Sequence, residues 1–171
     1  MILPRQLRWL WLTLGVVFVD RGTKAWVESR PADYFPHPVI PGIFHIVSAR
    51  NPGIAFSFLA ENSSPVVRVL LILGSLVIMG IIAWLLVGGR RSSPWNSAGL
   101  ALILAGAAGN LTDRIVHGAV TDFLEVWVRF LPSRLFQPWP AFNVADAAVT
   151  IGAALVVFDV LFGQHDRVLS R

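Results

Sequence analysis

The sequence contains no cysteine and little charge, and these two absences narrow the classes of protein that it can encode. Without cysteine, the chain can form neither disulfides nor thiolate metal sites. Only 14% of its 171 residues are charged and 55% are hydrophobic, a balance too apolar for an ordinary soluble domain of this length. Internal repeats and low-complexity tracts are absent as well. We therefore expect residues 1–171 to form a single integral membrane domain.

Long apolar runs account for the excess of hydrophobic residues. A helix of about 20 residues, rising about 1.5 Å per residue, covers the roughly 30 Å hydrocarbon core of a bilayer. The runs lack the alternation of apolar and polar residues that is typical of membrane-spanning strands. We therefore predict an all-α membrane protein with four transmembrane helices, at about residues 7–27, 65–87, 95–116 and 142–162.

Two segments, 28–64 and 117–141, lie outside the predicted spans. The first is rich in proline, and residues 39–47 place β-branched and aromatic side chains between turn signals. This pattern predicts a small sheet or hairpin lying on the membrane. The sequence Asn51-Pro52-Gly53 is typical of a tight turn.

The basic residues predict an orientation in the membrane. The chain has 13 Arg and one Lys, and a basic balance can indicate either nucleic acid or acidic lipid as a partner. Here six arginines fall at the span ends that a topology with both termini inside would place in the cytoplasm: Arg5, Arg8, Arg90, Arg91, Arg167 and Arg171. The positive-inside rule predicts this clustering, so we expect membrane lipids and no nucleic acid.

Polar residues gather at the opposite, outer ends of the spans. A charged side chain in mid-membrane costs about 2.5–3.5 kcal/mol of insertion free energy. Each such side chain therefore needs a partner, a place near water at the end of the span, or a function. Asp20 and Lys24 are four residues apart on one helix face and can pair. Asn110, Asp113 and Arg114 form a second patch, able to pair locally or with the first. Interfacial ion pairing or helix packing would also explain both patches.

Two further acids, Asp122 and Asp146, stand beside the last span. Asn143 and Asp146 open that helix, and ordinary helix capping explains part of this pattern. Two carboxylates held close together share a proton, so one can activate water while the other protonates a carbonyl oxygen or a leaving amine. No serine with a base, phosphate loop or cluster of metal ligands competes with this pair. We therefore expect neither a metal nor a cofactor.

Residue spacing alone leaves two other functions open. A small proton-coupled transporter would also use intramembrane acids, although it predicts acids across the membrane depth and an inverted repeat. A non-catalytic scaffold would use the small residues 105–109 of the third span for helix packing.

Five motifs together resemble lipoprotein signal peptidase, also called signal peptidase II. They occur in the order of that family, at residues 20–24, 51–57, 106–114, 120–123 and 142–146. The resemblance implies an aspartic endopeptidase with a small extracytoplasmic β cradle, acting at the periplasmic side of the bacterial inner membrane with both termini cytoplasmic. It would remove signal peptides from diacylglyceryl-modified prolipoproteins by cutting just before the lipid-modified cysteine. We expect a monomer.

The resemblance also assigns roles by motif position. Asp122 and Asp146 correspond to the catalytic pair. The positions that match substrate-binding or supporting residues are Asp20, Lys24, Asn51, Gly53, Asn110, Asp113, Arg114, Asn143 and Ala145. The chain departs from the family pattern at Ala107, where a second glycine is usual, and in a longer stretch between the two acids that includes residues 131–140.

Overall fold

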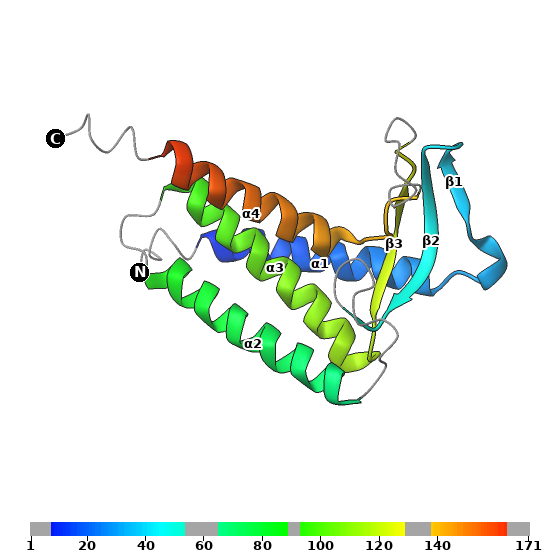
Figure 1. Cartoon of the computed structure of the whole chain (residues 1–171), viewed down its shortest axis with the longest axis horizontal. Coiled ribbons are helices and arrows are strands. Elements are labelled where there is room, and N and C mark those ends of the chain that lie inside the picture. Colours follow the sequence, from blue (N-terminus) through cyan, green and yellow to red (C-terminus); the bar gives the residue numbers. More distant parts are fainter. Residues whose placement is uncertain (1–7, 54–64, 89–92, 129–137, 164–171) are drawn as a thin grey trace.

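The computed structural model of the chain describes residues 8–53, 65–88, 93–128 and 138–163. Within these residues the helices are α1 (Trp9–Glu28), α2 (Pro65–Gly88), α3 (Pro94–Val116) and α4 (Val144–Phe162), with one 3-10 turn, η1 (Ala32–Tyr34). The strands are β1 (His37–Ile40), β2 (Phe44–Asn51) and β3 (Val120–Val126). The helices lie alongside one another and the sheet stands at one end of them (Figure 1). The predicted helical fold with a small sheet is confirmed.

Three of the helices, α2, α3 and α4, are long and apolar enough to cross a membrane. Helix α1 has 20 residues but carries Asp20, Arg21 and Lys24 in its second half, and it is not among the spans that length and hydropathy identify in the described residues. Asp20 and Lys24 are both completely buried. These two charges therefore face the protein interior, which is where charged side chains of membrane helices are found.

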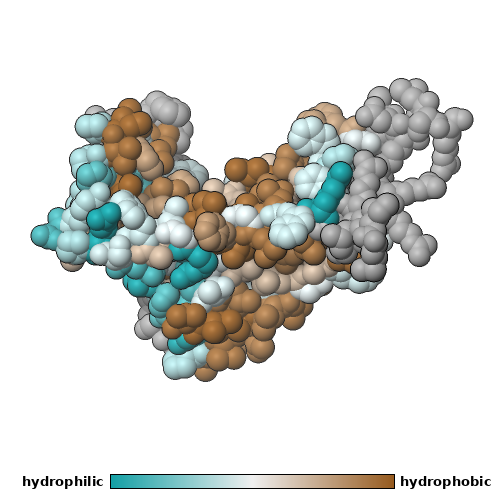
Figure 2. Space-filling model, turned by 180° about the vertical axis from the view of Figure 1, so that it is seen from behind, coloured by the Kyte–Doolittle hydropathy of each residue, from teal (hydrophilic) through white to brown (hydrophobic). Residues whose placement is uncertain are grey.

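The helices expose much of their apolar surface. Phe18 is 79% exposed and Leu70 62% exposed, and many similar side chains accompany them. Hydrophobic surface covers much of the helical part, whereas hydrophilic residues gather toward the sheet (Figure 2). An apolar surface of this extent is typical of contact with lipid or with another protein, and here it lies on helices of membrane-spanning length.

The apolar core lies in the part of the helices distant from the sheet. Ile82 and Leu86 of α2 pack there against Leu100 and Leu104 of α3. Helices α3 and α4 approach closely at two glycines, since a Cβ added at Gly99 would lie 2.7 Å from the carbonyl oxygen of Gly152. Within the small residues at 105–109, a Cβ added at Gly106 would collide with the carbonyl oxygen of Ala145, so this stretch serves helix packing as the sequence predicts.

The sheet is antiparallel, with the strand order β1-β2-β3. The predicted β structure over residues 39–47 is confirmed, although β2 continues to Asn51. The register of β2 and β3 pairs Ala49 with Asp122 and Asn51 with Val120. Strand β3 therefore places Asp122 beside the end of β2.

The last span begins later than the sequence predicts. Phe142 is not helical, because its backbone pairs with Leu124 of β3 and extends the edge of the sheet. Asn143 is the N-cap and α4 starts at Val144. Some predictions lie outside the described residues: the end of the second motif at 54–57, most of the longer stretch at 131–140, and the arginines at 5, 90, 91, 167 and 171.

Candidate active site

The end of helix α3 turns directly into the strand that carries Asp122, the first acid of the pair. Helix α3 closes at His117, whose backbone N–H donates to the carbonyl oxygen of Asp113 at 2.7 Å. Gly118 follows with φ of 80°, a left-handed conformation that glycine adopts without steric cost. The chain can therefore turn at once into β3, in which Val120 to Phe123 are all buried. As a result, the Asp122 side chain is only 3% exposed.

A capping box at the start of α4 positions the second acid. The Asn143 side chain accepts a hydrogen bond from the backbone N–H of Asp146 at 2.9 Å, and Asp146 Oδ2 accepts one from the Asn143 backbone N–H at 3.1 Å. The predicted capping is confirmed. It uses only one polar atom of each side chain. Asn143 Nδ2 and Asp146 Oδ1 therefore remain available for other contacts.

Side-chain amides bind both carboxylates. Asp122 Oδ1 accepts a hydrogen bond from Asn143 Nδ2 at 2.7 Å, and its Oδ2 accepts one from Asn51 Nδ2 at 3.1 Å. Asp146 Oδ1 accepts one from Asn110 Nδ2 at 2.8 Å. With the capping bond to Asp146 Oδ2, each of the four carboxylate oxygens has a protein donor. These contacts fix the orientation of both acids.

Burial and the neighbouring acid perturb Asp122. Desolvation by burial, followed by the charge of Asp146, raises the pKa of Asp122 from 3.8 to about 6. The amides of Asn51 and Asn143 oppose this rise in pKa because they stabilise the carboxylate. A carboxyl group with this pKa can bind and release a proton near neutral pH.

A buried charge cluster lies behind the two acids. Lys24 Nζ is 2.9 Å from Asp20 Oδ2 and 2.8 Å from Asp113 Oδ2, and all three side chains are fully buried. Arg21 forms a further ion pair with Asp113. The predicted pairing of Asp20 with Lys24 is therefore confirmed, and Asp113 joins it from α3. The cluster contains two cations and two anions, so its formal charges balance.

Within this cluster, Asp20 fixes the start of α4 against α1 and α3. Asp20 Oδ1 accepts a hydrogen bond from the backbone N–H of Ala145 at 2.9 Å, which places a carboxylate at the positive end of the helix. A Cβ added at Gly109 would lie 2.6 Å from Asp20 Oδ2, and one added at Gly106 would collide with the Ala145 carbonyl oxygen. The two glycines therefore make room for the turn that carries Asp146.

Arg114 stabilises the turn at residues 51–53 by hydrogen bonding. Its Nη2 donates to the carbonyl oxygen of Gly53 at 2.9 Å, and Asn51 Oδ1 accepts from the backbone N–H of Gly53 at 3.0 Å. The predicted tight turn at residues 51–53 is confirmed. Among the described residues no carboxylate oxygen lies within 4.0 Å of the Arg114 guanidinium nitrogens, so the structure does not show the pairing with a nearby acid that the sequence allows. Its guanidinium binds backbone carbonyl groups instead, including that of Asn110 at 3.4 Å.

Both acids line one cavity of about 580 Å³. Asn51, Asn110 and Arg114 complete its polar wall. The rest of the lining is mainly apolar and consists of Trp139, Pro140, Ala141, Phe142, Ala147, Val149 and Ile151, together with Val120 and Thr150. A few convergent polar groups in a largely apolar cavity are typical of a binding or catalytic site.

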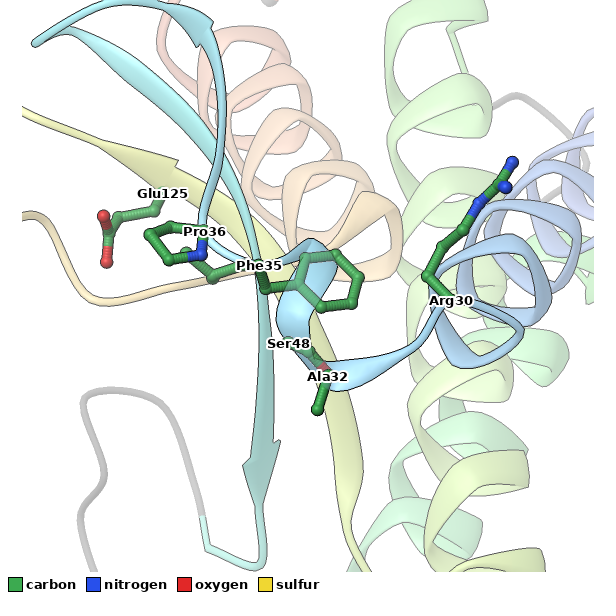
Figure 3. Close-up of a pocket in the computed structure, with 7 residues that line it drawn as sticks. Arg30, Ala32, Phe35, Pro36, Ser48 and Glu125 are labelled. Carbon is green, nitrogen blue, oxygen red and sulfur yellow. The ribbon is translucent and has the colours of Figure 1, made fainter.

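A second cavity, of about 570 Å³, lies between the end of α1, the η1 turn and the sheet. Phe35, Pro36 and Val47 contribute to its lining. Its two charged residues, Arg30 and Glu125, extend in opposite directions in Figure 3. These charges do not converge on one point, so this cavity lacks the arrangement found around Asp122 and Asp146.

Sequence reasoning missed two polar residues that brace β3. Thr121 Oγ1 donates to Glu28 Oε1 at 2.6 Å, and the Thr121 backbone N–H donates to Asp113 Oδ2 at 3.3 Å. Because side chains alternate along a strand, Thr121 points away from the face that Asp122 uses. The available signal was the place of Thr121 directly before the acid, but it indicates this role only once β3 is known to be a strand. The described residues contain no group of three or more His, Asp or Glu side chains arranged to hold a metal ion.

The fold and this cavity define a class: helical membrane proteins that hold two carboxyl groups in a cavity where the helices meet a small sheet. The family model described as signal peptidase (SPase) II matches residues 12–162. The chain belongs to the signal peptidase II family. The family and the apolar helices identify it as a bacterial membrane protein.

Individual relatives agree with this assignment. Lipoprotein signal peptidases of Yersinia pestis (strain Pestoides F) and Yersinia pseudotuberculosis (serotype O:3, strain YPIII) are each 42% identical over 158 residues, covering 90% of this chain and 86% of the relative. Two solved structures described as a bacterial membrane enzyme match with a TM-score of 0.76 at 25% identity. They cover 90% and 91% of this chain and 87% and 93% of their own chains.

Proposed function

We propose that this protein is an aspartic endopeptidase that removes the signal peptide from diacylglyceryl-modified prolipoproteins. Membership of the signal peptidase II family makes it a peptidase, and its relatives carry the name lipoprotein signal peptidase. The observation that supports an aspartic mechanism is the placement of Asp122 and Asp146 in one cavity, with amide donors on every carboxylate oxygen.

The proposed reaction needs one carboxylate and one carboxylic acid. The carboxylate removes a proton from water, whose oxygen then attacks the carbonyl carbon of the scissile peptide bond. The carboxylic acid protonates the carbonyl oxygen, and proton transfer to the leaving nitrogen accompanies cleavage of the C–N bond. The products are a new carboxyl terminus on the signal peptide and a new amino group on the mature lipoprotein. A pKa of about 6 suits Asp122 to the role of the carboxylic acid, so we assign the role of the carboxylate to Asp146.

The shape of the cavity supports a membrane-anchored substrate. Trp139, Phe142 and Ile151 give it an apolar wall, which can accept an apolar segment or an acyl chain. Amide and guanidinium groups on the polar wall, from Asn51, Asn110 and Arg114, can hydrogen-bond the backbone of an extended peptide. The substrate would therefore present its scissile bond at the membrane surface, with its lipid along the apolar wall.

The orientation that we propose places the sheet outside the cytoplasmic membrane. The cavity lies where the helices meet the sheet, whereas Arg8 precedes the opposite end of α1 (Figure 1). Basic residues favour the cytoplasmic side, which supports our proposal that the cavity is at the periplasmic face and both chain ends are in the cytoplasm. We further propose that the protein acts as a monomer, since the polar residues assigned to the site converge on a single cavity that this chain forms by itself.

Cleavage by the purified protein tests this proposal. The detergent-solubilised chain is incubated with a diacylglyceryl-modified prolipoprotein, and mass spectrometry locates the cut. We expect one cut, directly before the lipid-modified cysteine, and no cut in the matched precursor that lacks the lipid. Absence of cleavage, or cleavage that does not depend on the lipid, would contradict the proposed substrate class.

A further inference from the structure

Hydrogen bonds connect Lys24 to Asp146 through Asn110. Its ammonium group ion-pairs with Asp20 and Asp113, and among the described residues it pairs with neither Asp122 nor Asp146. It also donates a hydrogen bond to Asn110 Oδ1 at 3.2 Å. Asn110 in turn donates from Nδ2 to Asp146 Oδ1 at 2.8 Å. The lysine is outside the cavity lining, whereas Asn110 is part of it.

The chemistry of these groups fixes the direction of the hydrogen bonds. An ammonium group has only donors, so it must face the oxygen of the Asn110 amide and not its nitrogen. Asn143 Nδ2 donates to the same oxygen at 3.2 Å. With two donors on its oxygen, the amide can present only its NH₂ group to Asp146. The opposite orientation would place the Asn110 amide oxygen against the Asp146 carboxylate. It would also place the Asn110 NH₂ group against the donors of Lys24 and Asn143.

Burial prevents Lys24 from leaving this position. Its side chain is fully buried, and the two carboxylates on either side of it are fully buried too. A lysine in this setting has no path to water that keeps its charge compensated. Its ammonium group is therefore a fixed donor, whereas an asparagine amide can present either end to a neighbour.

We propose that Lys24 is a positioning residue for catalysis that acts through Asn110, holding the Asn110 amide so that its NH₂ group donates to Asp146. This inference rests on the proposed function, because it assigns a supporting role within the same site. Lys24 would then orient Asn110 in addition to neutralising the buried carboxylates of Asp20 and Asp113. Loss of the lysine removes one of the two donors on the Asn110 oxygen and leaves only Asn143, so the amide and its hydrogen bond to Asp146 are held less firmly.

The position of Lys24 predicts a specific kinetic effect. Because Lys24 is outside the cavity lining, its replacement leaves the substrate contacts in place and KM changes less than twofold. Because a hydrogen bond to a charged group is lost, kcat falls about 10- to 100-fold. Lys24→Gln is the informative change, since glutamine can present either a donor or an acceptor to Asn110.

A double-mutant cycle tests whether the effect passes through Asn110. Cleavage of a diacylglyceryl-modified prolipoprotein is measured under single-turnover conditions for the original chain, Lys24→Gln, Asn110→Ala and the double variant. We expect Lys24→Gln to have no further effect once Asn110 is alanine. An equal loss of rate in both backgrounds would overturn the proposal, as would an unchanged kcat for Lys24→Gln.

Arg21→Gln is the matched control, because Arg21 pairs with Asp113 in the same cluster but does not contact Asn110. We expect it to lower the unfolding temperature while leaving kcat within about twofold.

If Lys24→Gln does not fold, the charge-balanced variant Lys24→Gln/Asp113→Asn is compared with Asp113→Asn alone, and the same loss of kcat is expected. Asp146→Asn separates the two proposals. Full activity of Asp146→Asn overturns the proposed function, whereas inactive Asp146→Asn together with fully active Lys24→Gln overturns only the role of Lys24.

Discussion

Asn143 Nδ2 lies 2.7 Å from Asp122 Oδ1, so the residue that caps α4 also holds an acid that belongs to β3. The same asparagine exchanges capping hydrogen bonds with Asp146. One side chain therefore couples the start of the last helix to the last strand and sets the two carboxylates relative to each other. The arrangement explains how acids 24 positions apart in the sequence share one cavity.

Replacing Asn143 with alanine is expected to weaken both stability and activity. Loss of the N-cap costs about 1 kcal/mol of unfolding free energy. Loss of the donor to Asp122 lowers kcat about tenfold or more, because a hydrogen bond to a charged group disappears. Thermal unfolding in detergent and prolipoprotein cleavage measure the two effects.

Ser93→Ala provides the control for this prediction. Ser93 is the N-cap of α3, where its Oγ accepts from the Asn96 backbone N–H at 3.1 Å, and it is not part of the cavity. We expect a similar loss of stability with kcat preserved. Equal loss of kcat in both variants would mean that Asn143 acts only as a cap.

The raised pKa of Asp122 predicts a pH dependence of stability. Its carboxyl group has a pKa of about 6 in the folded protein against an ordinary value of 3.8, so the folded state binds the proton more tightly. The resulting stabilisation is complete below about pH 4 and is lost as the pH rises through 6, in total about 3 kcal/mol. Unfolding temperatures between pH 4 and pH 7 measure it. Asp122→Asn removes the titrating group, so the difference in unfolding temperature between the two proteins should change between pH 4 and pH 7. A difference that stays constant over this range would contradict the raised pKa.

Gly109→Ala is expected to disturb the start of α4. The added methyl group would lie 2.6 Å from Asp20 Oδ2 and 3.2 Å from Ala145 Cβ, which displaces the carboxylate that binds the Ala145 N–H. Overpacking of this kind costs about 1–3 kcal/mol, and kcat should fall as Asp146 moves. Gly22→Ala is the control, since nothing lies within 4 Å of its added methyl group. A Gly109→Ala variant as stable and active as Gly22→Ala would contradict this account of the helix contact.

The absence of cysteine permits a clean test of the proposed orientation. Ser48 is exposed on β2, and Gly88 is exposed at the last residue of α2. Single cysteines at these positions are treated with a membrane-impermeant maleimide, with access to the periplasm but not to the cytoplasm. We expect Ser48→Cys to react and Gly88→Cys to react only after the membrane is opened. The reverse pattern would contradict the periplasmic location of the cavity.

Much of the helical fold could be predicted from the sequence because its signals are local. Apolar runs of bilayer length mark α2, α3 and α4, Pro65 starts α2, and Asn143 caps α4. Helix α1 was equally predictable in length. Its charges break the apolar signal, and they are tolerated because Asp20 and Lys24 are buried against each other and against α3.

The remaining features depend on contacts between distant segments. Strand β3 escaped prediction because Val120 to Phe123 are all buried, so the alternation that marks a half-buried strand is missing. Spacing could suggest that Asp20 pairs with Lys24, but not that Asp20 also binds the Ala145 N–H of α4. Arg114 binds the Gly53 carbonyl group, a backbone partner that no side-chain pattern reveals.

The most direct test of the account is cleavage of a diacylglyceryl-modified prolipoprotein by Asp122→Asn and by Asp146→Asn. Asparagine keeps the size of each side chain but can neither remove a proton from water nor donate one as an acid. We expect each variant to fold, as judged by thermal unfolding, and to lose at least 100-fold in kcat, on the order of a general acid–base contribution. Undiminished cleavage by either folded variant would contradict the central claim that these two carboxyl groups perform the hydrolysis.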